Sequence, residues 1–155
     1  MLLRWLFLSA LVVAAVLLLL QATAPNREDR HARRARRALR EIVRRSRHRG
    51  AEGKKLVAEA RLVVSGLEKL NARAAEIRRF LGSRELDALA RRQLEEYLSE
   101  IEALLEGGAA LLERLAAELW ASEPLDLPAA AARLSRARMG LIKALKSPAE
   151  KEGVN

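Results

Sequence analysis

Few residues of this chain have the chemistry of an active site. His31 and His48 are its two histidines, and it has no cysteine. Both histidines lie among arginines, whose positive charge would repel a metal ion, so we expect no metal site. Glutamates such as Glu95 and Glu96 fall where a solvated helix face would place them, with arginines four residues away. Catalysis needs a convergent set of groups, and the sequence offers none. We therefore predict that the chain is not an enzyme and carries no cofactor.

The distribution of arginine along the chain indicates a binding partner of negative charge. The net charge is +9, and residues 50–155 carry 17 basic and 17 acidic groups, so the excess lies nearer the N-terminus. Residues 27–49 hold eleven arginines against three acidic residues. These arginines form the predicted basic segment: Arg27, Arg30, Arg33, Arg34, Arg36, Arg37, Arg40, Arg44, Arg45, Arg47 and Arg49.

Three interpretations of the basic segment stay open. Arginines beside a membrane span hold that side of the chain in the cytoplasm, which by itself would explain them. They would also attract anionic lipid headgroups. A nucleic-acid arm is the third interpretation, but the segment lacks the aromatic side chains on which single-stranded bases stack, so we expect nucleic acid to be an unlikely partner.

A hydrophobic stretch precedes the basic segment. The residues from Trp5 to Leu20 are uncharged, and with Leu2, Leu3 and a snorkelling Arg4 the stretch nearly spans a hydrocarbon core of about 30 Å. The alternative is a cleaved signal peptide, for which residues 22–24, Ala-Thr-Ala, supply a small-x-small site. Pro25 after that site and the arginines beyond it favour the membrane anchor.

The arginines also predict the orientation of the anchor. Lysine and arginine near a span stay on the cytoplasmic side, and the flank after the span carries eleven arginines against Arg4 before it. We therefore expect a single-pass protein of a bacterial inner membrane, with its N-terminus outside and its C-terminal domain in the cytoplasm.

The rest of the chain has the apolar periodicity of helices. Apolar residues recur every three or four positions, aromatics are only 3% of the chain, and leucine, alanine, arginine and glutamate dominate. Whether the basic segment continues into the next helix or is separated from it by a loop at 50–53 stays open, because Gly50 and Gly53 interrupt the pattern. The predicted packing core comprises Leu56, Val63, Leu67, Leu70, Ile77, Leu94, Ile101, Leu104, Leu111 and Leu115.

Gly82 and Ser83 predict the turn of a helical hairpin. A turn there would pair residues whose numbers sum to about 165, so that Gly66 faces Ser99 and Gly107-Gly108 faces Val57-Ala58. Small residues would then face small residues, although a kink at the glycine pair is an equal alternative. Asp126 is expected to cap a last helix near 128–146, which folds back on the hairpin or leaves a surface for a second copy of the chain.

The predicted fold class is therefore all-α: an N-terminal transmembrane helix, a long coiled-coil-like hairpin and a short third helix that folds back. The expected segments are an anchor at 1–24, a basic juxtamembrane helix at 25–53, a hairpin or three-helix bundle at 54–146 and a flexible tail at 147–155. We predict a structural or interaction module that self-associates or docks a cytoplasmic protein. The alternative is an exported helical binding or chaperone-like protein released by signal cleavage.

Overall fold

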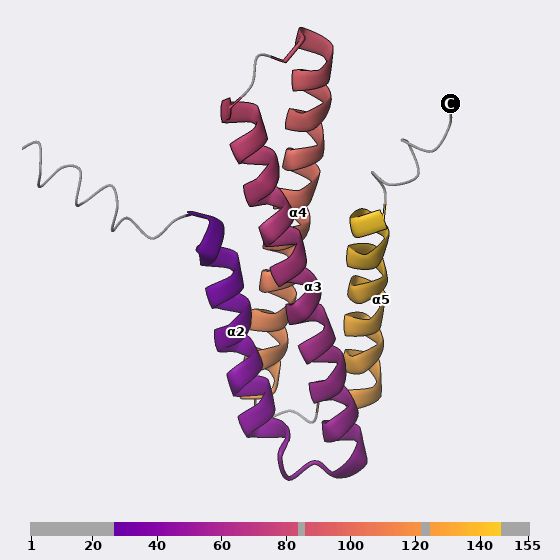
Figure 1. Ribbon diagram of the computed structural model, residues 1–155. Helices are drawn as coiled ribbons and strands as arrows, with labels where there is room; N and C mark the ends of the chain where they lie inside the picture. Colours follow the sequence, from indigo (N-terminus) through magenta and orange to yellow (C-terminus); the bar gives the residue numbers. More distant parts are fainter. Residues whose placement is uncertain (1–26, 84–85, 122–124, 147–155) are drawn as a thin grey trace, which may run out of the picture.

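Four helices make up the part of the chain that the computed structural model describes, which is residues 27–83, 86–121 and 125–146 (Figure 1). They are α2 (Arg27–Ser46), α3 (Gly50–Ser83), α4 (Ala88–Glu118) and α5 (Leu127–Lys146). The described residues contain no strand. The predicted all-helical bundle is confirmed for this part of the chain.

Helix α3 is the central helix of the bundle. It packs against α2, α4 and α5, while α2 also packs along α4 and α5 makes a smaller contact with α4. Each helix runs opposite in direction to the one before it, so the bundle is of the up-and-down kind (Figure 1). The basic segment therefore does not stand apart from the hairpin, because α2 is one of the four packed helices.

The core is made of leucine, isoleucine, valine and alanine from all four helices. Of the ten predicted core residues, Leu94, Leu104 and Leu111 are partly buried and the other seven are buried. On α4, Leu105 and Leu112 are the more deeply buried neighbours of Leu104 and Leu111. The apolar stripe of α4 is broad enough to serve two neighbours, and the positions of α2 and α3 decide which leucines are covered.

The chain turns back between α2 and α3 at residues 47–49, just before Gly50 and Gly53. Gly50 adopts a left-handed φ of 63°, which glycine reaches without a steric penalty. A Cβ on Gly53 would lie 2.5 Å from the backbone oxygen of Ser46, so a glycine is needed for the two helices to meet there. The basic segment and α3 are two helices joined by a tight turn.

The register of the α3–α4 hairpin differs from the prediction. A Cβ on Gly108 would lie 2.6 Å from Cδ2 of Leu67, and one on Gly66 would lie 3.0 Å from Cδ1 of Leu141 on α5. The glycines therefore make room for leucines, and the expected pairing of small residues with small residues is wrong. The cause is the turn: α3 continues through Ser83 and α4 begins only after Asp87, which displaces the facing residues.

Two aspartates begin the last two helices. Oδ1 of Asp87 accepts a hydrogen bond from the backbone N–H of Ala90 at 2.7 Å. Oδ1 of Asp126 accepts one from the N–H of Ala129 at 3.0 Å, which confirms the predicted cap of α5. Helix α5 then folds back along the bundle, chiefly against α3.

Within the described ranges, no helix is both long and apolar enough to cross a membrane. The predicted anchor at 1–24 and the predicted tail at 147–155 lie outside the described residues.

Candidate functional site

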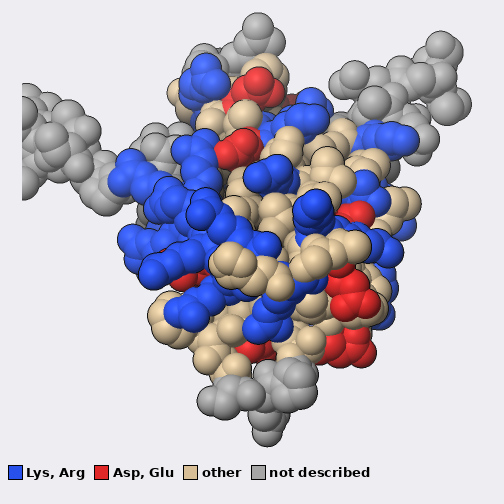
Figure 2. All heavy atoms as spheres, turned by 90° about the horizontal axis from the view of Figure 1, so that it is seen from below, with Lys and Arg blue, Asp and Glu red and all other residues tan. Residues whose placement is uncertain are grey.

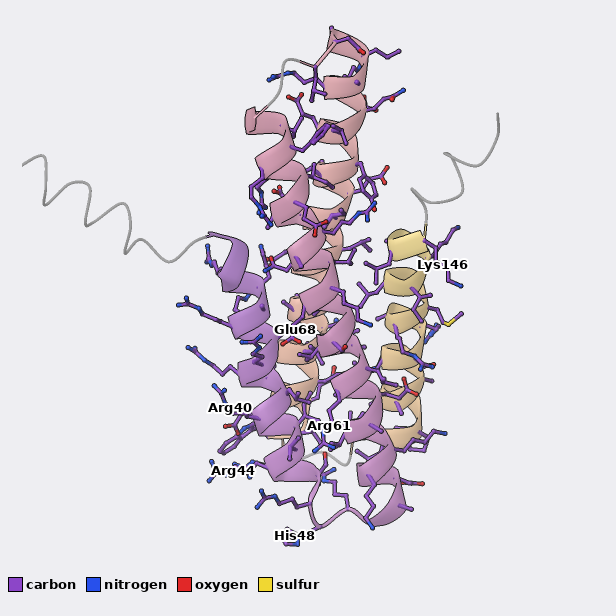
Figure 3. The ribbon with its side chains drawn as sticks, in the orientation of Figure 1. Arg40, Arg44, His48, Arg61, Glu68 and Lys146 are labelled. Atoms are coloured by element: carbon purple, nitrogen blue, oxygen red, sulfur yellow. The ribbon has the colours of Figure 1, made fainter. Side chains whose placement is uncertain are left out.

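A row of arginines runs along the outer side of α2 and into the turn that follows it. Consecutive members are three or four residues apart, the spacing that keeps side chains on one face of a helix. All six are exposed. Figure 3 shows Arg40 and Arg44 directed away from the other helices. We call this row the arginine stripe: Arg30, Arg33, Arg37, Arg40, Arg44 and Arg47.

The opposite side of α2 holds the stripe in place. Ala32, Ala35, Ala38, Ile42 and Ser46 are buried there, and they repeat at the same three- and four-residue spacing. Three of the five are alanines, so the α2 backbone can lie close to its neighbours. The helix thus has one wholly buried face and one face made of arginine.

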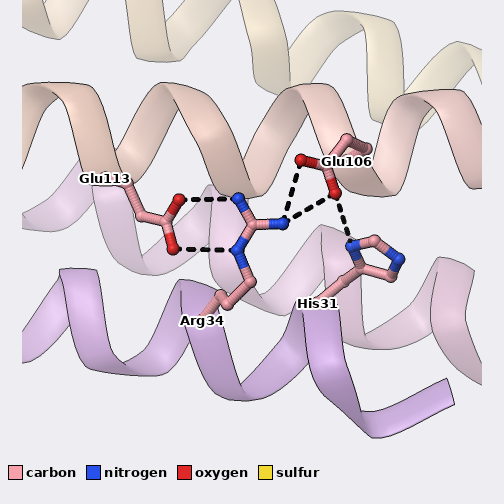
Figure 4. A network of polar contacts seen from close by, with 4 residues as sticks. All are labelled: His31, Arg34, Glu106 and Glu113. Atoms are coloured by element: carbon pink, nitrogen blue, oxygen red, sulfur yellow. Dashed lines mark hydrogen bonds and ion pairs between the residues drawn. The ribbon is translucent and has the colours of Figure 1, made fainter. Parts of the chain in front are cut away.

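Arg34 fastens one flank of α2 to α4 (Figure 4). Its Nε and Nη2 donate to the carboxylate of Glu113 at 2.9 and 2.7 Å, and its Nη1 donates to that of Glu106 at 2.9 and 2.7 Å. Nδ1 of His31 lies 3.1 Å from the same Glu106 carboxylate. Hydrogen bonds from Arg34 lower the pKa of Glu113 and of Glu106, and those carboxylates raise the pKa of Arg34.

Two more arginines of α2 have partners in the bundle, one on α3 and one in the turn after α4. Nε of Arg36 donates to Glu68 of α3 at 2.7 Å. The guanidinium carbon of Arg45 lies 3.2 Å from the ring centroid of Trp120, whose side chain is more than half exposed. Arg34, Arg36 and Arg45 thus link the flanks of α2 to the rest of the bundle, while the arginines of the stripe are exposed.

Acidic residues are concentrated on a different helix. Helix α4 carries seven glutamates and three arginines, whereas α5 carries basic residues and no acidic one. Seen from the end of the bundle, lysine and arginine gather over the side on which α2 lies (Figure 2). The molecule therefore presents a strongly basic side, which a surface of negative charge would attract.

The structure places the eleven predicted arginines in three groups. Six form the stripe, while Arg34 contacts α4, Arg36 contacts α3 and Arg45 contacts Trp120 in the turn after α4. Arg49 is half-buried in the turn, and the side chain of Arg27 lies outside the described set. Sequence reasoning treated the segment as uniform and missed the α4 partners, although the spacing of 3, 4, 3, 4 and 3 within the stripe was available in the sequence.

Metal chemistry finds no support in the described ranges, where no group of three or more histidine, aspartate or glutamate side chains could hold an ion. The chain also matches no protein-family model, no curated protein and no solved structure.

Proposed function

We propose that this chain is a membrane-associated interaction module without catalytic activity, in which the bundle holds the arginine stripe against anionic lipid headgroups. The observation that carries the proposal is the stripe itself. Five of its six arginines, from Arg30 to Arg44, occupy successive outward positions of α2, and Arg47 continues the row into the turn. The part of the row on the helix extends about 21 Å, at about 1.5 Å per residue, and a flat surface can meet all of it at once.

The packing of α2 supports this role. Because the opposite face of the helix is buried, the stripe keeps its geometry before and after binding, and little backbone entropy is lost on contact. The carboxylates of Glu106 and Glu113 are engaged by Arg34 on the flank. Basic residues near an anionic bilayer contribute about 1 kcal/mol each, and the attraction fades within a Debye length of about 10 Å.

In this proposal the hydrophobic N-terminal segment is a tether that keeps the bundle at the cytoplasmic side of a bacterial inner membrane. The stripe then serves two purposes, because arginines that follow a span also fix its orientation. The remaining helices offer a helical surface for self-association or for a cytoplasmic partner. The whole is a tethered scaffold whose basic side faces the bilayer.

The lipid contact is tested on fragment 27–155, after circular dichroism has shown that it is helical. Vesicles of phosphatidylcholine, with and without phosphatidylglycerol, are sedimented with the fragment at low salt. The test variant changes Arg37, Arg40 and Arg44 to glutamine. Losing three contacts of about 1 kcal/mol each should weaken binding to the anionic vesicles by about a hundredfold.

The matched control changes Arg91, Arg92 and Arg114 of α4 to glutamine, which alters the net charge by the same amount. The proposal requires this variant to bind anionic vesicles within about threefold of the unchanged fragment. Equal losses in the two variants would mean that net charge alone governs binding, and the stripe would then have no special role. A duplex DNA probe that binds through the stripe while the vesicles do not would assign the stripe to nucleic acid instead.

The tether is tested separately in a bacterial host with a reporter at the C-terminus that is active only in the cytoplasm. An intact chain with an active reporter is the expected result. A chain shortened near residue 24, with a silent reporter, would show export and would reject the cytoplasmic placement.

A further inference from the structure

A groove of about 320 Å³ lies between the end of α2 and the beginning of α3. It is next to the C-terminal end of the arginine stripe, and Arg47 belongs to both. Its walls come from the two helices and from the turn between them. The lining residues are Val43, Ser46, Arg47, Gly53, Lys54, Val57, Ala58 and Arg61.

The groove combines three cationic side chains with three apolar ones. Arg47, Lys54 and Arg61 are basic, and none of the eight lining residues is acidic. Lys54 and Arg61 are seven residues apart on α3, which places them on one side of that helix about 10 Å apart along its axis. Figure 3 shows Arg61 on the front of α3, beside the lower half of α2. Such a set of charges would draw in an anion small enough to sit between them.

Ser46 is a second and independent sign that the groove takes a polar ligand. Ser46 lines the groove and is only 2% exposed. Its Oγ has no hydrogen-bond partner among the described residues. Buried hydroxyl groups in folded proteins nearly always have a partner. A ligand oxygen at this end of the groove would accept the hydrogen bond that the protein leaves unmade.

Gly53 shapes the groove at the same point. A Cβ there would meet the backbone oxygen of Ser46 at 2.5 Å and Cβ of Arg49 at 3.0 Å. The glycine therefore lets α3 begin against the end of α2, and this contact brings Ser46 and Lys54 to one groove. Val43, Val57 and Ala58 supply carbon surface beside the charges.

We propose that this groove binds the phosphate group of a phosphate ester. Arg47, Lys54 and Arg61 neutralise the phosphate and donate hydrogen bonds to it, as arginine and lysine do at phosphate sites in general. The hydroxyl of Ser46 donates to one phosphate oxygen, and the carbon part of the ester rests on Val43 and Val57. The ester is either a lipid headgroup or a soluble metabolite. The lipid source rests on the proposed membrane function, whereas the phosphate site itself does not.

The test uses the full chain in phosphatidylcholine nanodiscs and follows the backbone amide signal of Gly53 by NMR. In one arm inorganic phosphate or glycerol 3-phosphate is titrated into the sample. In the other arm phosphatidic acid replaces part of the phosphatidylcholine. A saturable shift of the Gly53 signal is expected in at least one arm. A response to phosphatidic acid alone identifies a lipid headgroup, and a response to the soluble esters identifies a soluble phosphate ester.

Two variants and two matched controls locate the binding site. Ser46→Ala and Lys54→Gln should each weaken binding by about tenfold, because each removes one donor to a charged ligand. Ser65→Ala and Lys69→Gln change the same residue types at exposed positions of α3 and should leave binding unchanged. The proposal is overturned if neither arm gives a saturable shift, or if the variants and the controls behave alike.

Failure of this site and failure of the proposed function give different results. Neutralising Arg37, Arg40 and Arg44 of the stripe should reduce attachment to anionic vesicles but leave the saturable shift at Gly53. Loss of vesicle binding in that variant with an intact Gly53 shift supports two separate contacts.

Discussion

Alanine at each of the two adjacent glycines of α4 should have clearly different effects on stability. Gly107 is exposed, and a Cβ there would meet no atom within 4 Å. Glycine inside a helix is about 0.8 to 1.0 kcal/mol less favourable than alanine, so Gly107→Ala should stabilise the bundle by about that amount. Gly108 is buried, and a Cβ there would lie 2.6 and 3.2 Å from the two δ carbons of Leu67.

The cost at Gly108 follows from the position of Leu67. That side chain is fully buried, so it has little room to move aside. Overpacking a core position of this kind costs about 1 to 3 kcal/mol. Since alanine brings the same gain in helix propensity at both positions, the two variants should differ in unfolding free energy by about 1 to 3 kcal/mol. At about 4 °C per kcal/mol, their melting temperatures should differ by about 4 to 12 °C.

The assay is thermal and urea unfolding of fragment 27–155, followed by circular dichroism. Both variants must first show the helicity of the unchanged fragment, so that their transitions report on the same fold. Equal stabilisation by the two alanines would refute the contact between Gly108 and Leu67, and with it the register of α3 against α4. A stabilised Gly108→Ala with a destabilised Gly107→Ala would reverse the assigned faces of α4.

Three further predictions concern other contacts of the bundle. Arg34→Gln should cost about 1 to 2 kcal/mol of stability, because it removes two ion pairs with α4. Arg92→Gln breaks a pair between two exposed side chains and should cost less than about 0.5 kcal/mol. Equal costs would contradict the Arg34 network. Because the pKa values of Glu106 and Glu113 are lowered in the folded state, the unfolded chain takes up protons first as the pH falls below about 4.3. The free energy of unfolding should therefore decrease as the pH falls through that range, and it should decrease less steeply in Arg34→Gln. Urea titrations at several pH values that give the same pH dependence for both proteins would exclude this linkage. Gly53→Ala should destabilise the bundle by about 1 to 3 kcal/mol, because the added Cβ would clash with the backbone oxygen of Ser46. A Cβ at Gly82 would meet no atom within 4 Å, so Gly82→Ala should cost no stability. Coinciding unfolding curves of the two variants would disprove the close approach at Ser46.

The sequence was most informative where periodicity and capping act locally. Asp126 and the apolar spacing after it predicted α5, and the three- and four-residue steps of Leu56, Ala60, Val63 and Leu67 predicted a buried face of α3. Such signals depend on neighbours within one or two turns of the same helix, which a single sequence contains.

The relation between helices was harder to predict. The pairing of Gly108 with Leu67 depends on the length of the turn before Ala88, and a difference of a few residues there moves every facing pair. The packing of α2 into the bundle could not be predicted for another reason. Its buried residues Ala32, Ala35 and Ala38 are small, and eleven arginines dominate the composition of that segment.

The division of arginines within the basic segment needed the structure as well. Arg34 and Arg37 look alike in the sequence, yet Arg34 binds two carboxylates of α4 while Arg37 belongs to the exposed stripe. The residues that make this difference, Glu106 and Glu113, lie more than 70 positions away. No local pattern links residues so far apart in the chain.

The alanines beneath the stripe also bear on how the molecule opens. Ile42 is the large, fully buried side chain of α2, whereas α3 and α4 each bury several leucines completely. Smaller side chains remove less apolar surface from water, so packing holds α2 less strongly than it holds α3 and α4. Amide hydrogens of α2 should therefore exchange with solvent through a local opening of lower free energy than global unfolding. The helix that carries the arginines is then a separable cooperative unit, and any ligand that engages the stripe only in its docked geometry slows that opening.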